Sequence, residues 1–332
     1  MNLQNRITLL LKLRTYLLEN GEEWQNIKLK ASIHNGWFNI EFIDIAIQNI
    51  VTQFLAEDKL SEWLNHYPVD DNTIPKNVGI VMAGNIPMVG FHDFLCVFVS
   101  GHYQTIKLSA KDDVLLKFLI EKMIGWNQEV EHAVLFAPML KGCDAYIATG
   151  SNNSARYFDY YFAKYPSIIR KNRTSVAILK GTETDEDLRN LGKDIFQYFG
   201  LGCRNVSKLL VPAGYSLDRF FESQVDFGFV INNKKYGNNY DYHRAIYLLE
   251  SLPFLDNNFV MLRESPELHS PVGVLYYQFY SSEKEINDYL NLNKDKIQCI
   301  IGENHLGFGY SQKPVITDFA DGIDTRDFLV NL

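Results

Sequence analysis

The 332-residue sequence predicts an α/β protein with two domains, preceded by a helical N-terminal segment. From Val78 onward, short apolar segments typical of buried strands alternate with helical patterns, which favours parallel sheets covered by helices on both faces. A chain of this length usually divides into two hydrophobic cores. Hydrophobic residues make up 46% of the chain and charged residues 22%, which is typical of a folded protein.

The helical N-terminal segment is predicted to cover residues 1–76 and to pack on the domain that follows. Apolar residues between Phe42 and Leu55 recur at helical spacing. Residues 67–76 are polar and contain two prolines, so we expect a linker there. The N-terminus lacks the cleavage site of a signal peptide, and no apolar run is long enough to span a membrane. We therefore expect a cytoplasmic protein without stable membrane insertion.

The first predicted sheet lies in the part of the chain that follows this linker. Strands are expected at residues 78–82, 103–108, 132–136 and 145–149, with an apolar helix between the first two. Ligands of parallel sheets gather at the carboxyl ends of the strands. Polar residues that follow these ends and could hold a ligand are Asn85, Lys107, Ser109, Gly150 and Ser151. Turn formation explains such residues equally well.

The second predicted domain is organised around Cys203. A helix that begins after Thr184 and is closed by Gly200 precedes this cysteine, and an apolar strand at 206–211 follows it. Glycines at two of the three preceding positions leave the thiol accessible. Arg204 favours the thiolate, whereas the negative end of the helix opposes it. Cys203 is therefore either a nucleophile or a small buried hydrophobic residue.

The second half of the chain continues the alternation of helix and strand. Residues 166–181 place a basic cluster before a strand, which is either a solvated face or an anion site for phosphates. Further along we expect an amphipathic helix near 217–225, a loop rich in Tyr and Asn at 236–242, and a strand at 272–279.

Composition excludes several classes of function. The net charge of -8 gives no electrostatic surface for nucleic acid. The four cysteines are scattered without a C-x-x-C pair, which excludes a zinc ribbon and indicates a reducing compartment. The eight histidines show no metal-ligand spacing, so no metal is expected. Neither G-x-G-x-x-G nor a P-loop occurs, so a nucleotide would have to bind in another way.

Five motifs, in this order along the chain, are similar to motifs of the aldehyde dehydrogenase superfamily. They are Asn85-Ile-Pro87, Ile106-Lys-Leu-Ser109, Thr149-Gly-Ser151, Gly202-Cys-Arg-Asn-Val-Ser-Lys208 and Glu267-Leu-His-Ser-Pro-Val272. Segments 309–314 and 318–325 resemble the LuxC-type branch, the acyl-CoA reductases that make fatty aldehydes. The resemblance implies an aldehyde-dehydrogenase-like fold of two doubly wound parallel-sheet domains, with a nucleotide-binding domain at 77–180 and a catalytic domain at 181–318. The tail at 319–332 would return to the first domain or form an oligomer interface.

The same resemblance implies roles for individual residues. Cys203 would be the catalytic nucleophile, and the side-chain amide of Asn85 together with the backbone N–H of Cys203 would hold the oxyanion. The residues implied to hold the cofactor are Lys107, Ser109, Gly150, Ser151 and Glu267. NADPH is the implied cofactor, with NADH as the alternative, because Ala110 and Lys111 stand where relatives that use NAD often carry an acidic residue.

One departure from the family pattern indicates the reaction. Ile169 stands where hydrolytic members carry a glutamate, and an isoleucine cannot activate water. The resemblance thus implies NAD(P)H-dependent reduction of a fatty acyl-CoA, or another acyl thioester, to an aldehyde through an acyl-enzyme on Cys203. The alternatives are a CoA-acylating aldehyde dehydrogenase that works in the oxidative direction, and a non-catalytic nucleotide-binding partner of a fatty-acid complex. The implied partners are an acyl-CoA or acyl-protein thioester, a second copy of the chain in a homo-oligomer, and an acyl-transferring protein.

Overall fold

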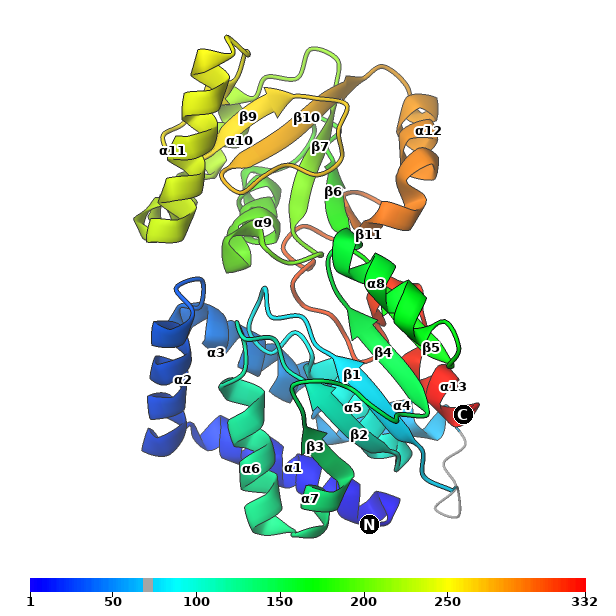
Figure 1. Ribbon diagram of the computed structural model, residues 1–332. Helices are drawn as coiled ribbons and strands as arrows, with labels where there is room; N and C mark the ends of the chain where they lie inside the picture. Colours follow the sequence, from blue (N-terminus) through cyan, green and yellow to red (C-terminus); the bar gives the residue numbers. More distant parts are fainter. Residues whose placement is uncertain (68–73) are drawn as a thin grey trace. The chain divides into compact units, whose positions relative to one another are not determined.

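The computed structural model describes residues 1–67 and 74–332, which form two compact units (Figure 1). The first unit consists of Met1–Asn172 and Pro314–Leu332, and the second of Arg173–Lys313. Residues 68–73 of the predicted linker lie outside the described residues. The division after Asn172 comes before the boundary expected at residue 180, because the strand that begins at Thr174 pairs within the sheet of the second unit.

The N-terminal segment is helical, as predicted. Its helices are α1 (Leu3–Glu19), α2 (Glu22–His34), α3 (Ile40–Asn49) and α4 (Glu57–Asn65), with a π-helical turn at Ile50–Phe54. Helix α1 packs against α5 (Phe91–Ser100) and α6 (Leu115–Trp126). The apolar residues between Phe42 and Leu55 lie in the same hydrophobic core as the sheet that follows. These helices therefore complete the core of the first unit.

A five-stranded parallel sheet forms the centre of the first unit, in the order β3-β2-β1-β4-β5. Its strands are β1 (Asn77–Val81), β2 (Tyr103–Lys107), β3 (Val134–Phe136), β4 (Ala145–Thr149) and β5 (Ser167–Arg170). The four predicted strands are confirmed, although the third is shorter because the preceding residues form helix α7 (Glu129–Ala133). Strand β5 lies inside the segment predicted only as a basic cluster.

Helix α5 is buried almost completely, between β1 and the helices α1 and α13 (Thr325–Val330). Its Asp93 forms an ion pair with Arg170 of β5, with 2.5 Å between Oδ2 and Nη1. The Nη2 atom of Arg170 donates to Thr325 Oγ1 at 2.8 Å. Because this guanidinium is buried and bound within the protein, Arg170 does not contribute to the predicted anion site.

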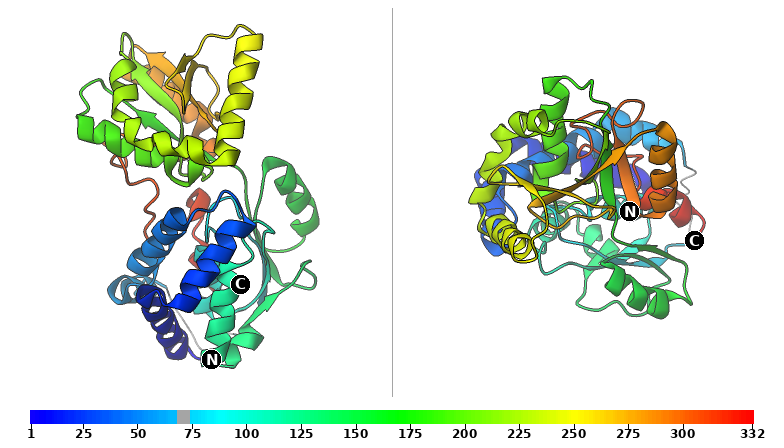
Figure 2. Two further views of the ribbon diagram at one scale, coloured as in Figure 1. Left: turned by 90° about the vertical axis from the view of Figure 1, so that its left-hand side faces the viewer. Right: turned by 90° about the horizontal axis from the view of Figure 1, so that it is seen from above.

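The second unit contains a six-stranded sheet in the order β11-β6-β7-β10-β9-β8. Its strands are β6 (Thr174–Ile178), β7 (Val206–Pro212), β8 (Leu255–Asp256), β9 (Met261–Glu264), β10 (Val274–Tyr280) and β11 (Ile297–Ile301), of which only β8 pairs antiparallel. Helices α11 (Lys234–Leu249) and α12 (Glu283–Asn293) lie with the strands between them (Figures 1 and 2). The predicted α/β class with parallel sheets is thus confirmed.

The loop predicted at residues 236–242 is wrong, because these residues belong to helix α11. The side chain of Asn233 caps the helix by accepting hydrogen bonds from the amides of Lys235 and Tyr236. Tyr240 and Tyr247 are buried against β9 and β10. The tyrosines thus form the buried face of a helix, which a local composition rich in Tyr and Asn does not reveal.

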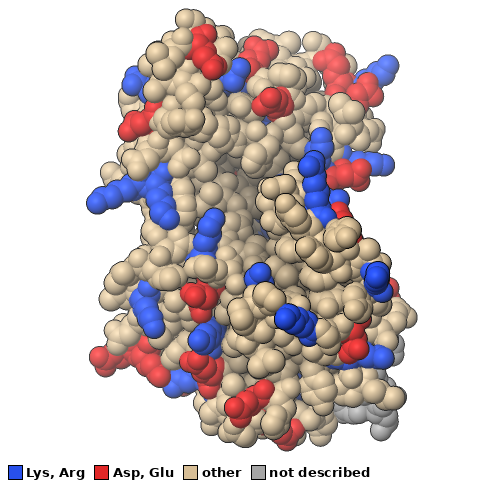
Figure 3. Space-filling model, viewed as in Figure 1, with Lys and Arg blue, Asp and Glu red and all other residues tan. Residues whose placement is uncertain are grey.

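No helix in the described parts of the chain is both long and apolar enough to cross a bilayer. On the face seen in Figure 3, Lys and Arg side chains are interspersed with Asp and Glu side chains.

Candidate active site

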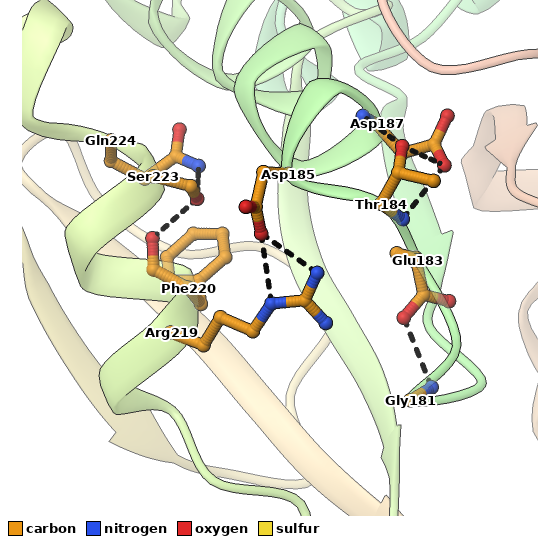
Figure 4. Close-up of polar contacts among 9 residues, drawn as sticks. All are labelled: Gly181, Glu183, Thr184, Asp185, Asp187, Arg219, Phe220, Ser223 and Gln224. Atoms are coloured by element: carbon orange, nitrogen blue, oxygen red, sulfur yellow. Dashed lines mark hydrogen bonds and ion pairs between the residues drawn. The ribbon is translucent and has the colours of Figure 1, made fainter.

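Cys203 lies in the turn between helix α9 (Asp185–Phe196) and strand β7. Helix α9 begins after Thr184, as predicted, and a capping box holds its start (Figure 4). Thr184 Oγ1 accepts a hydrogen bond from the Asp187 amide at 3.1 Å, and the Asp187 carboxylate accepts one from the Thr184 amide at 2.9 Å. Arg219 binds the Asp185 carboxylate at 2.7 Å in the same first turn. Acidic side chains stabilise this end because the helix dipole is positive there.

The end of α9 differs from the prediction. The helix ends at Phe196, and not at the expected closing residue Gly200. Tyr198 and Phe199 take left-handed conformations, with φ of 53° and 57°, and Gly200 follows with φ of 73°. Such conformations cost energy for residues other than glycine, so neighbouring interactions must hold the chain there.

Asn205 provides these interactions, and the sequence analysis missed it. Its buried side-chain amide donates to the carbonyls of Asp194 at 3.0 Å and Gln197 at 2.9 Å, which are backbone groups at the end of α9. Its Oδ1 atom accepts from the Gly202 amide at 2.8 Å. One side chain therefore holds both the end of the helix and the residue before Cys203. An asparagine in a short turn, where it can bind backbone groups on both sides, was the available signal.

Two further contacts hold the same turn. Ser175 of β6 is fully buried, and its Oγ atom donates to the carbonyl of Cys203 at 3.1 Å. Arg204 Nε donates to the carbonyl of Ser311. The buried carboxylate of Asp194 accepts from the Ser311 amide at 2.9 Å, so a second segment of the unit lies beside the turn. Burial raises the pKa of Asp194, while its amide hydrogen bonds act in the opposite direction.

The four cysteines differ in their surroundings. Cys96 and Cys143 are buried, and burial raises the pKa of both thiols, so they remain protonated and are poor nucleophiles. Cys299 is partly exposed, as Cys203 is, but it lies on strand β11, at the edge of its sheet, and not in a turn. Cys203 is partly exposed, in a turn flanked by glycines. It is therefore not the buried hydrophobic residue that was the alternative interpretation.

The loops after β1 and β2 touch each other in the first unit. Asn85 lies in the first of these loops, and a Cβ atom added to its neighbour Gly84 would lie 2.7 Å from the Oγ of Ser109 in the second loop. Lys107 is the last residue of β2 and is exposed. No described residue forms a hydrogen bond or ion pair with its ammonium group.

Asp112 connects these two loops and was not predicted as a site residue. Its Oδ2 atom accepts from the amide of Met88 at 2.7 Å, and Met88 has a φ of 58°. Asp112 is almost completely buried, and its Oδ1 atom has no hydrogen-bond partner among the described residues. Burial raises the pKa of Asp112 to about 7, although the hydrogen bond from Met88 acts in the opposite direction.

Gly150 and Ser151 follow β4 and begin helix α8 (Asn152–Phe162). The Oγ of Ser151 caps this helix by accepting from the Ser154 amide at 3.2 Å. A Cβ atom on Gly150 would lie 2.9 Å from Phe158, so a larger residue does not fit without rearrangement. The N-terminus of α8 is therefore tightly packed and electrically positive.

Glu267 lies in the second unit, in the loop of residues 265–273 that joins β9 to β10. Its side chain is exposed, and its amide donates to Ser265 Oγ at 3.2 Å. Ile169 lies on β5 of the first unit, opposite Ala148 of β4. The strand predicted at 272–279 corresponds to β10, which follows this loop.

Comparison with solved structures finds proteins of similar architecture. Aldehyde dehydrogenase 21 from Physcomitrella patens, in complex with its reaction product succinate, has a TM-score of 0.68 and 15% identity over 92% of this chain and 74% of its own. The NAD-dependent aldehyde dehydrogenase from Sinorhizobium meliloti has a TM-score of 0.67 and 13% identity over 95% and 73%. The NAD+ complex of aldehyde dehydrogenase from Bacillus cereus has a TM-score of 0.64 and 14% identity over 91% and 72%.

The fold is that of the aldehyde dehydrogenases. No family model and no curated protein sequence matches the chain. The predicted aldehyde-dehydrogenase-like architecture is therefore confirmed, whereas assignment to the LuxC-type branch stays a prediction.

The predicted site residues divide between the two units of this aldehyde dehydrogenase fold. Those in the first unit are Asn85, Lys107, Ser109, Gly150 and Ser151, and those in the second are Cys203 and Glu267. The first group lies at or just after the carboxyl ends of β1, β2 and β4, whereas Cys203 precedes the amino end of β7. An oxyanion site shared by Asn85 and Cys203 stays a prediction. The described residues contain no cluster of three or more side chains that could bind a metal.

Proposed function

We propose that this protein reduces an acyl thioester, such as a fatty acyl-CoA, to an aldehyde with NADPH, through an acyl-enzyme on Cys203. The observation that carries the proposal is that Cys203, a partly exposed residue, lies in a turn that is held from both sides, within an aldehyde dehydrogenase fold. A nucleophile needs both access and a fixed position.

The first unit has features that fit a dinucleotide. The exposed ammonium of Lys107 has no partner in the described residues, and the positive N-terminus of α8 begins at Ser151. We propose that these groups, with Ser109 and Gly150, bind the adenosine and phosphate parts, and that Glu267 binds the nicotinamide ribose. When bound, the cofactor supplies the hydride for the reduction.

The chain's own residues perform the acyl transfer. The thiolate of Cys203 attacks the carbonyl carbon of the thioester and forms a new carbon–sulfur bond. The bond to the first thiol then breaks, and that thiol leaves as a thiolate that takes up a proton from water. The amide of Asn85 and the backbone N–H of Cys203 stabilise the negative oxygen between these steps. When the aldehyde is released, the bond between carbon and sulfur breaks and Cys203 is free again.

Water must not reach this acyl-enzyme, because hydrolysis would give a carboxylic acid instead of an aldehyde. Ile169, on β5, stands at the proposed position of the base that activates water in hydrolytic relatives. Its side chain has no group that can accept a proton. We therefore propose a long-lived acyl-enzyme and negligible oxidation of aldehydes to free acids.

The structure also supports NADPH as the cofactor. The carboxylate of Asp112 is buried and bound to the Met88 amide, so it is not directed at a ribose. Asp113 lies 3.4 Å from the imidazole of His34, on α2. Lys111 is exposed in the same loop, where its ammonium favours a 2′-phosphate.

Mass spectrometry of the intact protein tests the nucleophile. After mixing with an acyl-CoA in the absence of NADPH, the wild type and the control Cys299→Ala should each gain the mass of one acyl group. Cys203→Ala should gain none, because it has no thiol to acylate. NADPH added to the acylated wild type should release aldehyde.

An adduct that persists in Cys203→Ala would refute the proposed mechanism. An acyl-enzyme that forms from aldehyde only when NADP+ is present to accept the hydride would favour the oxidative alternative. In that case CoA-dependent oxidation of the aldehyde should be fast and reduction of the acyl-CoA slow. Nucleotide binding without any adduct on the wild type would indicate a non-catalytic partner.

A further inference from the structure

The loop that carries Glu267, residues 265–273, is bound to strand β7 by two side chains. Ser207 Oγ donates to the carbonyl of Leu268 at 2.9 Å, and Lys208 Nζ donates to the carbonyl of Ser265. The two acceptors lie on either side of Glu267, whose own amide is bound to the Ser265 hydroxyl. Strand β7 is also the strand that follows Cys203, so the nucleophile and this loop share one support.

Lys208 is an unusual residue for this position. Its side chain is 0% exposed, and lysines are rarely buried unless they are paired. Among the described residues, its hydrogen-bond acceptor is the neutral Ser265 carbonyl, and the ring of Tyr289 lies 5.5 Å from Nζ. Lys28, which is also buried, instead binds the carboxylate of Asp44. An ammonium held mainly by a neutral carbonyl is costly, so packing alone does not explain it.

The charged surroundings of Lys208 point to the same loop. The titratable groups that face it are Glu264 at the end of β9, Glu267 in the loop, and Tyr289 on α12. Burial lowers the pKa of Lys208 to about 8, while the two carboxylates act in the opposite direction. The ammonium is therefore largely charged at neutral pH and becomes neutral within an accessible pH range.

We propose that Lys208 is a positioning residue, which holds the carbonyl of Ser265 so that Glu267 keeps the place and orientation needed to bind the nicotinamide ribose. This inference rests on the proposed function, because it assigns Glu267 to that ribose. Lys208 itself does not reach the ligand, since it is fully buried beneath the loop. Its effect should thus be confined to the part of the cofactor that Glu267 contacts.

Two ligands separate this effect from a general loss of structure. Calorimetry would measure the Kd of NADPH and of adenosine 2′,5′-bisphosphate, which lacks the nicotinamide ribose. In Lys208→Met the Kd of NADPH should rise about tenfold, which corresponds to about 1.4 kcal/mol. The Kd of the bisphosphate should stay unchanged. The control Lys28→Met, at the other buried lysine, should change neither.

A double-mutant cycle tests whether Lys208 acts through Glu267. If it does, Lys208→Met combined with Glu267→Gln should bind NADPH no more weakly than Glu267→Gln alone. Lys208→Arg keeps the charge and should restore most of the affinity. The NADPH affinity of the wild type should fall as the pH rises through about 8, and that of Lys208→Arg should not, because arginine stays protonated.

Hydrogen exchange provides a readout without cofactor. The amides of Ser265, Glu267 and Leu268 should exchange faster in Lys208→Met than in the wild type, whereas Lys28→Met should match the wild type there. If Lys208→Met does not fold, Ser207→Ala can replace it, because it removes the hydrogen bond from Ser207 to the same loop. This variant should show the same faster amide exchange and weaker NADPH binding, with smaller changes.

The outcomes separate the inference from the proposed function. Three results would overturn the role of Lys208. They are an equal loss of affinity for NADPH and the bisphosphate in Lys208→Met, additive losses of NADPH affinity in the double variant, and unchanged amide exchange at Ser265, Glu267 and Leu268. These results leave the proposed function intact if Cys203 still forms its acyl adduct. A wild type that binds neither NADPH nor the bisphosphate would overturn both.

Discussion

Asn205 shows how much a single side chain contributes to the candidate site. It is 2% exposed, and its hydrogen bonds reach the end of α9 and the residue before Cys203. The left-handed residues Tyr198 and Phe199 lie between these contacts. Without the hydrogen bonds of Asn205, the backbone of the turn would move to a conformation of lower energy. The position of the thiol therefore depends on a neighbour that takes no part in the chemistry.

Replacing Asn205 with alanine should lower the free energy of unfolding by about 2–4 kcal/mol, because buried backbone groups lose their partners. Acylation of Cys203 should become about tenfold slower or more, since the thiol is less well placed. Urea denaturation and timed mass spectrometry would measure the two effects. The control Asn239→Ala, which removes an exposed contact within α11, should change neither. Wild-type stability in Asn205→Ala would contradict this account.

Asp112 makes stability depend on pH. Its folded pKa of about 7 lies above the value of about 4 for an unfolded aspartate, so the folded protein binds the proton more tightly. Between these values, the free energy of unfolding should therefore rise as the pH falls. Asp112→Asn keeps an acceptor for the Met88 amide and removes the charge, so its gain in stability over the wild type should be larger at pH 8 than at pH 5.

Urea unfolding at pH 5, 6.5 and 8 measures this difference. Asp113→Asn removes a neighbouring charge that contributes to the raised pKa of Asp112, so the rise in stability on acidification should be smaller in that variant than in the wild type. A constant difference between Asp112→Asn and the wild type over this range would show that Asp112 titrates normally.

At the scale of elements, one buried ion pair joins three parts of the first unit that are far apart in sequence. Arg170 lies on β5, Asp93 on α5 and Thr325 on α13, and all three are buried. This cluster holds the C-terminal helix against the sheet. The basic segment at 166–181 therefore includes a structural arginine, whereas its sequence suggested a solvated face or an anion site.

Arg170→Ala should lower the free energy of unfolding by about 3–5 kcal/mol, because it leaves the carboxylate of Asp93 buried without its partner. The adjacent Lys171→Ala removes an exposed lysine 3.4 Å from Asp159, and should change stability by less than about 0.5 kcal/mol. Thermal and urea unfolding would compare the two. The anion-site interpretation would regain support if Arg170→Ala stayed stable and lost affinity for NADPH.

At the scale of the whole molecule, the proposed reaction divides between the two units. The first unit carries the loops proposed for the cofactor, and the second carries Cys203. A change in a cofactor loop should therefore alter cofactor selection without altering acylation of the thiol.

Lys111→Glu tests this division. The new carboxylate should repel the 2′-phosphate of NADPH, and so lower the ratio of kcat/KM for NADPH over NADH about fivefold, mainly through the KM for NADPH. Acylation of Cys203 measured without cofactor should stay unchanged. Lys117→Glu, an exposed lysine on α6, is the control for charge alone. A wild type that prefers NADH, or an unchanged ratio in Lys111→Glu, would show that this loop does not bind the phosphate.

The sequence alone was sufficient for features that depend on neighbouring residues. Apolar patterns located four of the five strands of the first sheet, Thr184 as an N-cap marked the start of α9, and glycines near Cys203 indicated a turn. The order of five short motifs also led to the aldehyde dehydrogenase fold, although no curated sequence matches. Strands, helix caps and turns can be predicted in this way because they depend mainly on residues close in sequence.

The tertiary structure decided what depends on contacts between distant residues. The side chain of Asn205 binds the end of α9, which closes one turn earlier than predicted. Tyr240 is buried on helix α11, in a segment that the sequence suggested was a loop. The charge of Arg170 is paired with Asp93 of α5. In the sequence Lys208 looks like an ordinary strand residue, and only the structure shows that its ammonium donates a hydrogen bond to the carbonyl of Ser265, 57 residues later. The burial and the hydrogen bonds of these side chains depend on segments that pack against them from elsewhere in the chain. The free energy of burying or pairing a polar group is larger than the helix or strand propensity of a single residue, so the distant contacts decide the structure.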